Sequence, residues 1–341
     1  MFKIFLFTFT IFITNTFVFA TPYPHRISNR GILDSLLPRK SVDVSKMGIN
    51  AFVNDSRFGS ISDQFLEVKD TLGIKHVRIL LNWDDNVQRN PQASPDFSFY
   101  DDIVNAIPDG VTAFAVLTGV PSWMKSSSNW INNNPRKTFV EKWVKIVAQR
   151  YASKQKLIGF QIWNEPNMKS NPDNTTLDIL TSPERYVSML SDARSVIKKA
   201  RSNFLVINAA TTAINQNYPR SLDYNKKMKS LGMENIVDVW AMHYYGSQLE
   251  NVIRPGGIQS FTRSFKKPIW FTESGAKGIN KQREYAERYW TFLRSKIKRL
   301  SRIYFYQFTE DSSAQNTYGL KNLTSGLTVS DFYIWLRDRE R

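Results

Sequence analysis

The chain has 341 residues, no cysteine, three histidines and a formal net charge of +16 at pH 7. Without cysteine it can form neither disulfides nor thiolate metal sites, so its stability must come from a hydrophobic core. The histidines, His25, His76 and His243, are scattered along the chain, which argues against a zinc site with an H-x-H or H-E-x-x-H ligand set. We therefore expect neither a metal nor a cofactor.

The first twenty residues have the pattern of a secretion signal. One charge, Lys3, precedes an aromatic and β-branched run that ends in Val18-Phe19-Ala20, whose small or short residues suit a signal peptidase. The run is short for a membrane span and is interrupted by threonines and Asn15, so we favour a cleaved signal over an uncleaved membrane anchor. The prediction is a secreted or periplasmic protein whose mature domain spans residues 21–341, with no membrane contact beyond the signal.

Eight apolar runs rich in Val, Ile, Phe and Tyr follow along the mature chain. Apolar residues are often consecutive in them, which is typical of strands buried on both faces of a parallel sheet. The runs are Gly48–Val53, His76–Trp83, Thr112–Thr118, Leu157–Trp163, Phe204–Ala210, Val237–Tyr245, Pro268–Glu273 and Ile303–Phe308.

Segments with helical periodicity lie between these runs. Pro135–Ala152 places its apolar residues on one stripe, and Ser182 can cap a helix that begins at Pro183. Other segments with the pattern are Ser62–Leu72, Tyr100–Ile107 and Gln282–Leu300. Eight strands alternating with helices, with no Gly/Ser- or Pro-rich linker, predict a single-domain (β/α)8 TIM barrel of the α/β class.

The main alternative is an open sheet that binds a nucleotide. Such a sheet should carry a glycine-rich loop directly after its first strand. Here the first run is followed by Asn54-Asp55-Ser56-Arg57-Phe58-Gly59, which does not have that pattern. The loop therefore favours the barrel.

Polar residues gather at the predicted C-terminal ends of the strands, which in a barrel all face one cleft. The second, fourth, sixth and seventh strands contribute Arg78, Asn164-Glu165, His243-Tyr244-Tyr245 and Thr272-Glu273-Ser274. Glu165 and Glu273 end strands that are three apart in order, and such strands face one another across the mouth of an eight-stranded barrel. Two carboxyl groups flanking a cleft are the equipment of glycoside hydrolysis, in which one protonates the leaving oxygen and the other attacks the anomeric carbon.

Taken in order, these motifs resemble those of the clan A glycoside hydrolases, retaining (β/α)8 enzymes with catalytic glutamates after the fourth and seventh strands. The matching stretches are Trp163-Asn164-Glu165-Pro166-Asn167, His243-Tyr244-Tyr245-Gly246 and Ile269–Gly275, together with Arg78 and the Tyr318-Gly319-Leu320 loop. The resemblance extends from about Gly48 to the C-terminus. Within the clan, the segment Gly119-Val120-Pro121-Ser122-Trp123-Met124 and the chain length look most like families 39 and 5.

The resemblance implies a role for each matching residue. Glu165 would be the general acid/base and Glu273 the nucleophile, with their carboxyl groups about 5–5.5 Å apart as in retaining enzymes. Among the substrate-binding residues, Asn164 would hydrogen-bond the sugar 2-hydroxyl. Tyr245 would orient the carboxylate of Glu273. Arg78 would keep that carboxylate ionised, and His243 would bind near the acid.

Aromatic residues near the strand ends are candidates for stacking on sugar rings. Trp83 and Trp123 lie in predicted loops after the second and third strands, where they would either stack on substrate or pack in the core. The sequence also departs from the clan at the last strand, where a tryptophan usually lies under the sugar. Tyr306-Gln307-Phe308 contains none.

The leading hypothesis is therefore a retaining glycoside hydrolase that cleaves β-linked polysaccharide or oligosaccharide through a covalent intermediate. The positive charge would suit an acidic substrate, but simple solvation of the lysines is the favoured explanation, since no block of five or six like charges occurs. Alternatives are a catalytically silent carbohydrate-binding barrel and a transglycosylase. Nucleic-acid binding is disfavoured by the export signal and by the acidic pair.

Overall fold

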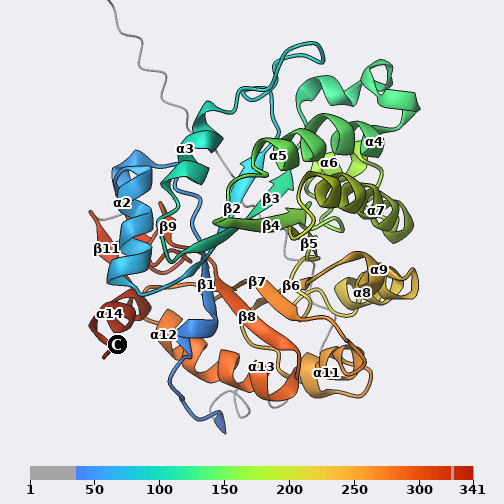
Figure 1. Ribbon diagram of the computed structural model, residues 1–341. Coiled ribbons are helices and arrows are strands. Elements are labelled where there is room, and N and C mark those ends of the chain that lie inside the picture. Colours follow the sequence, from blue (N-terminus) through green and yellow to red (C-terminus); the bar gives the residue numbers. More distant parts are fainter. Residues whose placement is uncertain (1–35, 324–325, 341) are drawn as a thin grey trace, which may run out of the picture.

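A computed structural model describes residues 36–323 and 326–340 and shows a barrel of eight parallel strands surrounded by helices (Figure 1). The predicted signal, residues 1–20, lies outside the described residues. The barrel strands are β1 (Met47–Asn50), β2 (His76–Asn82), β3 (Thr112–Thr118), β4 (Leu157–Ile162), β5 (Leu205–Asn208), β6 (Trp240–Tyr245), β7 (Ile269–Gly275) and β8 (Leu300–Phe305). The predicted (β/α)8 architecture is confirmed.

The strands follow one another around the sheet in the order β5-β4-β3-β2-β1-β8-β7-β6. The first and last strands of the barrel lie side by side, because β1 pairs in parallel with β8 from Met47 opposite Ile303 onward. A single backbone bridge between Ile207 and Val239 joins β5 to β6. That bridge brings together the two ends of the sheet and closes the barrel.

Two side chains complete the seam between β5 and β6. The carboxylate of Asp238 accepts the backbone N–H of Val206 at 2.8 Å. The side-chain amide of Asn208 donates to the carbonyl of Ala241 at 3.1 Å and accepts its N–H at 2.8 Å. These bonds satisfy backbone groups that would otherwise be buried without partners.

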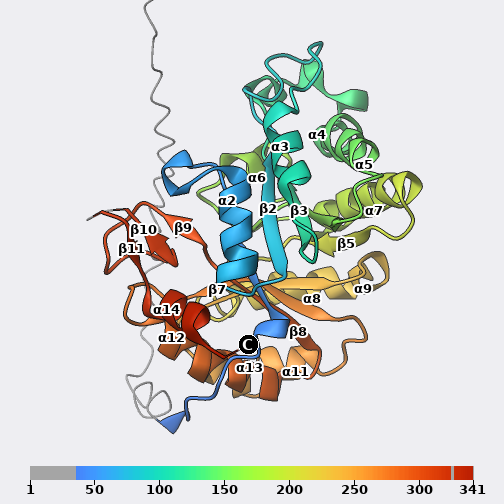
Figure 2. The same cartoon turned by 60° about the vertical axis from the view of Figure 1, so that its left-hand side comes forward.

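The helices form an outer layer around the strands (Figure 2). They are α2 (Ile61–Leu66), α3 (Ser98–Ala106), α4 (Pro135–Phe139), α5 (Lys145–Arg150), α6 (Pro172–Thr176), α7 (Pro183–Ala200), α8 (Arg220–Ser230), α9 (Met233–Ile236), α10 (Glu250–Ile253), α11 (Ile258–Thr262), α12 (Gln282–Tyr285), α13 (Thr291–Lys296) and α14 (Asp331–Asp338). As predicted, α7 begins at Pro183, and Ser182 caps it by accepting the N–H of Arg185. No helix within the described ranges is long and apolar enough to cross a membrane.

Two groups of apolar side chains fill the molecule. The larger one packs the outer faces of the strands against the helices. The smaller one includes Phe114, Trp270 and Tyr304, whose rings contact one another inside the barrel with centroids 5.1–5.8 Å apart. Gly48 faces Tyr304 so closely that an added Cβ would lie 2.2 Å from the ring, so the interior has no room for a side chain there. This packed floor leaves the C-terminal mouth of the barrel for polar groups.

After β8 the chain makes a small sheet of three two-residue strands before α14. These strands are β9 (Thr309–Glu310), β10 (Lys321–Asn322) and β11 (Thr328–Val329). Glu67 ties this part to the helical segment that continues α2, because its carboxylate binds the Lys321 ammonium at 2.7 Å and accepts the hydroxyl of Tyr333. The segment that joins β8 to this sheet carries Tyr306, whose ring lies beside that of Tyr245 at the end of β6.

Candidate active site

Glu165 lies in a turn that follows β4 and has an unusual backbone. Trp163 and Glu165 both have positive φ, 75° and 45°, a region that residues with side chains rarely adopt. Asn174 holds the turn: its amide donates to the carbonyls of Glu165 and Met168, each at 2.9 Å, and accepts the Trp163 indole N–H at 2.7 Å. A strained turn fixed by buried bonds is typical of a residue held in place for function.

Glu273 lies within β7, and its carboxylate is held at both oxygens. Arg78 donates from Nη1 to Oε1 at 2.8 Å, and the hydroxyl of Tyr245 donates to Oε2 at 2.7 Å. Burial raises the pKa of Glu273, but electrostatic interactions with His243 and Arg78 and the hydrogen bond from Tyr245 outweigh it and hold the pKa below its usual value. The carboxylate is therefore kept ionised in a buried place.

His243 lies between the two glutamates. Its Nδ1 is 2.9 Å from Oε1 of Glu165, and its Nε2 is 3.4 Å from Oε1 of Glu273. One carboxylate oxygen of each glutamate and one ring nitrogen of His243 all lie within 4.8 Å of one another. Such a trio could hold a metal ion, but Arg78 already supplies the positive charge to Glu273, which disfavours a second cation. The structure thus brings together the two carboxyl groups that the sequence places 108 residues apart.

Arg78 is almost fully buried and is the centre of a hydrogen-bond network. Besides Glu273, its guanidinium donates to Gln161 at 3.1 Å, to Asn50 at 2.6 Å and to Asn164 at 2.9 Å. The planar fork of an arginine suits several acceptors at fixed angles, which a lysine could not match. Arg78 therefore links strands β1, β2, β4 and β7 at one point and fixes the positions of Asn164 and Glu273 relative to each other.

Two members of this network, Asn50 and Gln161, are absent from the predicted site. Asn50 is in β1, and its amide also donates to the carbonyls of Thr272 and Phe305, each at 3.1 Å. Gln161 is in β4 and donates to the carbonyl of Trp163 at 3.2 Å. The sequence did carry a signal for them, since each is a polar residue inside an otherwise apolar strand run.

Three tyrosines form a wall beside Glu273. The ring centroid of Tyr245 is 6.0 Å from that of Tyr306 and 5.3 Å from that of Tyr318, and the latter two are 6.0 Å apart. Burial, and after it the negative charge of Glu273, raises the pKa values of Tyr245 and Tyr306. For Tyr318, burial and the charges of Glu310 and Glu273 raise the pKa to about 12. All three are therefore neutral hydrogen-bonding groups at physiological pH.

Glu310 organises the loop that carries Tyr318. Its Oε2 accepts the backbone N–H groups of Tyr318 and Gly319 and the hydroxyl of Thr317. Those bonds occupy one carboxylate oxygen of Glu310. Its role in the structure is to position the tyrosine wall.

The expectation of sugar stacking at Trp83 is wrong. The indole is fully buried, lies parallel to that of Trp143 with ring centroids 6.1 Å apart, and donates its N–H to Gln88 at 2.9 Å. It is part of the packing between β2 and the helices, so no ligand can reach it. Trp123 packs edge-on against Trp83 and donates to the carbonyl of Gln88, but it remains half-buried, and stacking at Trp123 stays a prediction.

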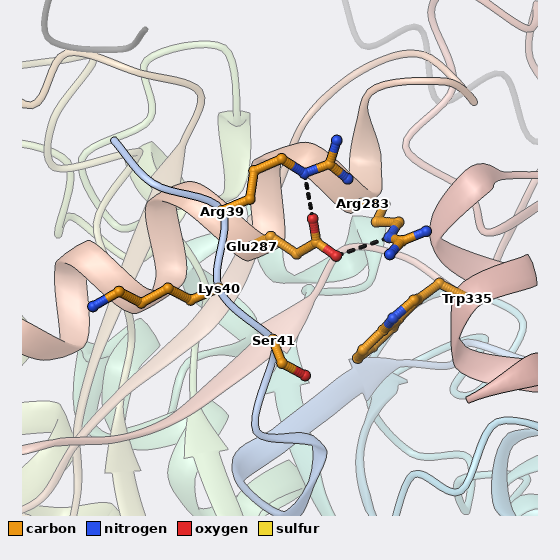
Figure 3. A pocket seen from close by; sticks show the side chains of 6 residues that line it. All are labelled: Arg39, Lys40, Ser41, Arg283, Glu287 and Trp335. Carbon is orange, nitrogen blue, oxygen red and sulfur yellow. Dashed lines mark hydrogen bonds and ion pairs between the residues drawn. The ribbon is translucent and has the colours of Figure 1, made fainter. Parts of the chain in front are cut away.

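Two cavities lie away from the carboxylate pair. One, of about 490 Å³, is lined by Arg39, Lys40, Ser41, Arg283, Glu287 and Trp335 (Figure 3). Its carboxylate, on Glu287, is occupied by both Arg39 and Arg283, which is the pattern of a structural ion pair. The other, of about 660 Å³, lies between the loop after β1 and helix α3. Neither is lined by Glu165 or Glu273.

Comparisons with solved structures show the same fold in several glycoside hydrolases. A family 39 glycoside hydrolase from Bacteroides cellulosilyticus WH2 has 14% sequence identity and a TM-score of 0.61, with 88% of this chain and 64% of that chain covered. A β-xylosidase from Caulobacter crescentus CB15 has 16% identity and a TM-score of 0.61, with 88% and 69% covered. Thermotoga maritima Cel5A has 20% identity and a TM-score of 0.54, with 86% and 97% covered. The chain therefore spans under two thirds of the Bacteroides protein but nearly all of Cel5A.

No curated protein sequence matches the chain. A family sequence model does, and it describes cellulase (glycosyl hydrolase family 5) over residues 39–307. That match covers most of the chain, includes both glutamates and agrees with the fold of the structural neighbours. The chain is a glycoside hydrolase of clan A and belongs to glycosyl hydrolase family 5, the cellulase family.

Proposed function

We propose that this enzyme hydrolyses β-linked polysaccharide or oligosaccharide outside the cytoplasm with retention of anomeric configuration. The observation that carries the proposal is the spacing of the carboxyl groups, since one oxygen of Glu165 and one of Glu273 lie within 4.8 Å of each other. Retaining enzymes place these groups about 5–5.5 Å apart, whereas inverting enzymes need about 6.5–9.5 Å to admit a water molecule.

In the first step Glu273 acts as the nucleophile. A carboxylate oxygen attacks the anomeric carbon while Glu165 donates its proton to the glycosidic oxygen, so the C–O bond breaks and the leaving sugar departs as an alcohol. The product is a glycosyl ester on Glu273. The low pKa of Glu273 keeps the attacking group ionised.

In the second step Glu165 acts as the base. It takes a proton from a water molecule, whose oxygen attacks the anomeric carbon and releases Glu273 as a carboxylate. Both glutamates return to their starting states, and two inversions give net retention. The contact between Glu165 and Nδ1 of His243 holds the carboxyl group in one position for both steps.

The surrounding residues control the charge and orientation of Glu273. Arg78 and Tyr245 hold its two oxygens, so the carboxylate plane is fixed before substrate binds. Asn164, held by Arg78, is placed to bind the 2-hydroxyl of the sugar. A protein that only binds carbohydrate would need neither an ionised buried carboxylate nor this network, which favours catalysis over a silent barrel.

The tyrosine wall is the proposed support for the sugar ring next to the scissile bond. Tyr306 is the first residue after β8, where the clan usually has a tryptophan, and its ring lies beside those of Tyr245 and Tyr318. Aromatic faces suit the C–H faces of a pyranose ring, while the phenol groups add hydrogen bonds. The β-xylosidase and Cel5A among the structural neighbours are consistent with a β-linked glycan.

The charges near the cleft favour a neutral glycan over an acidic one. Between the end of each barrel strand and the next α-helix, the sequence places seven basic and seven acidic residues in total. Within the strands, Glu273 of β7 and Arg78 of β2 add one charge of each sign and pair with each other. The large positive net charge of the chain is therefore not concentrated at the mouth of the barrel.

The test is product analysis on a panel of neutral and acidic β-glycans. We expect the wild type to release sugars that NMR shows to be β-anomers at first, and Glu273→Ala to lose nearly all turnover. Azide should restore activity to Glu273→Ala on an activated aryl glycoside and yield the α-glycosyl azide. An initial α-anomer from the wild type would show inversion and would overturn the mechanism.

A further inference from the structure

The end of the barrel opposite the cleft is strongly basic. The segments that lead into the eight strands are residues 43–46, 72–75, 107–111, 151–156, 201–204, 237–239, 263–268 and 297–299. They contain ten lysines and arginines and three aspartates, against seven and seven at the cleft end. All of these segments lie at one end of the barrel, because the strands are parallel.

Within these eight segments the aspartates do not offset the exposed basic residues; just outside them, Glu234 accepts the backbone N–H groups of Lys266 and Lys267. Each of the three aspartates already pairs with a lysine, in the pairs Asp43–Lys46, Asp109–Lys156 and Asp238–Lys198. Six further cations are exposed, and none has an ion-pair partner among the described residues. They are Lys75, Lys154, Arg263, Lys266, Lys298 and Arg299, and we call them the basic face.

The six cations of the basic face precede four of the eight strands, β2, β4, β7 and β8. Backbone bonds at the strand starts hold neighbouring segments together, such as Thr112 N–H to the carbonyl of Lys75 at 2.9 Å and Ile269 N–H to that of Arg299 at 2.8 Å. The cations are thus spread over several neighbouring strand starts at this end of the barrel. Charge spread over such an area matches an extended surface better than a single polymer strand.

In the described part of the chain, the aromatic rings near this end offer little free surface to a polymer, since Phe204 and Phe265 are buried and Phe261 is half-buried with Lys229 over its ring. Proteins that bind single-stranded nucleic acid interleave aromatic side chains with cations, and sugar polymers likewise stack on aromatic rings. Among the most exposed large apolar side chains of the described chain, the aromatic one is Phe99, which begins α3 at the cleft end. Binding to an anionic lipid surface needs only positively charged side chains and no aromatic platform.

The N-terminal part of the chain reaches the barrel at this same end. The described residues before β1 enter from the end where the strands begin (Figure 1), and they carry Lys40 and an exposed Leu36, while Arg39 is paired with Glu287. In the sequence, Arg26 and Arg30 precede them, after the apolar run.

We propose that the basic face docks the enzyme on an anionic lipid bilayer. Clusters of four to eight lysines and arginines bind anionic headgroups, and each exposed cation adds to the attraction. Docking by this face turns the cleft with Glu165 and Glu273 away from the lipid. The enzyme would then be held at a membrane surface while its active site stays open to polymer in solution.

The experiment compares two charge-reversal variants of the full chain. The face variant carries Lys75→Glu, Lys266→Glu and Lys298→Glu, which come from three strand starts. The control variant carries Lys125→Glu, Lys169→Glu and Lys281→Glu, which are also exposed but follow strands β3, β4 and β7. Both change the net charge equally. Mass spectrometry confirms that all proteins share one N-terminus, and circular dichroism confirms that they are folded.

Binding is measured by co-sedimentation with phosphatidylcholine vesicles with and without about 30 mol% phosphatidylglycerol. We expect the wild type to bind only the anionic vesicles and to lose binding as salt shortens the Debye length. The face variant should bind at least tenfold more weakly, and the control within twofold of wild type. Equal losses in the two variants, or equal binding to neutral vesicles, would refute the proposal. So would tighter binding of the wild type to alginate or DNA than to anionic vesicles at the same salt, since the partner would then be a polymer.

Discussion

Arg78 and Glu273 form an ion pair that is almost entirely shielded from water. The distance from Nη1 to Oε1 is 2.8 Å, and the side chains are 2% and 10% exposed. A pair in such surroundings costs much more to break than a pair at the surface, because the remaining charge stays buried without compensation. The first prediction rests on this relationship.

Replacing Arg78 with alanine should leave Glu273 buried without its main hydrogen-bonding cation. Removing one partner of a buried pair costs about 3–5 kcal/mol, and part of this would appear as protonation of Glu273 near neutral pH. We expect kcat/KM to fall by about a hundredfold or more and the free energy of unfolding to decrease. Steady-state kinetics and urea unfolding measure the two effects. Arg78→Lys, which keeps the charge but not the fork, should recover only part of the activity, and full recovery would contradict the role of the network.

The pH dependence of activity should follow the ionisation of the Glu273 carboxyl group. Its pKa is held below the usual value, so the acid limb of the kcat/KM profile should lie at lower pH than for an ordinary glutamate. Tyr245→Phe removes a hydrogen bond that lowers this pKa, and we expect the limb to move to higher pH. Because a depressed pKa stabilises the fold only above it, acidification through that pKa should also reduce the free energy of unfolding. An unmoved acid limb in the variant would show that another group controls it.

Asn174 should matter for activity although it lies behind the catalytic turn. Its amide makes three bonds to the segment that includes Glu165, and replacing it with alanine leaves two carbonyls and one indole N–H without that partner. An unsatisfied buried group costs about 1–3 kcal/mol. We expect a lower melting temperature, and a fall in kcat larger than the change in KM, because Glu165 loses its fixed position. If kcat stayed at the wild-type value, the turn would hold itself without Asn174.

Substitutions of Trp83 and Trp123 should have different effects, the first mainly on stability and the second on substrate binding if its ring stacks on sugar. Trp83→Ala removes a fully buried indole and should cost about 3–5 kcal/mol in the free energy of unfolding. Trp123→Ala removes a half-buried ring and should cost less. If Trp123 stacks on substrate, its loss will raise KM on long oligosaccharides more than on short ones. A similar KM for all lengths would place Trp123 among the packing residues.

Much of the fold could be predicted because parallel strands leave a strong trace in sequence. Each barrel strand is buried on both faces and therefore appears as a nearly continuous apolar run, as in Thr112–Thr118. The predicted bounds are least accurate for the eighth strand. It begins at Leu300, three residues before the predicted start, because Ser301 and Arg302 interrupt the apolar pattern. That shift placed Tyr306 inside a strand when it is in fact the first residue after one.

The site residues at strand ends could be predicted from the sequence. Those whose role depends on the direction in which the side chain points could not. Glu165 and Glu273 follow from the order of the strands alone. Trp83 directly follows a strand, and nothing in the sequence tells whether its ring turns toward the cleft or back toward the helices. Asn50 and Gln161 were missed because their function lies in a shared partner, Arg78, and such a partner is visible only in three dimensions.

The seam between β5 and β6 should tolerate fewer amino-acid substitutions than the other strand pairs of the barrel. Elsewhere around the barrel, neighbouring strands pair through backbone groups, so mutation can exchange one apolar residue for another without loss of the ladder. At the seam the pairing is completed by the side chains of Asp238 and Asn208. We therefore expect apolar exchanges to be tolerated along most of the wall, while loss of the Asp238 carboxylate or the Asn208 amide should leave only the backbone bridge of Ile207 and Val239 to close the ring.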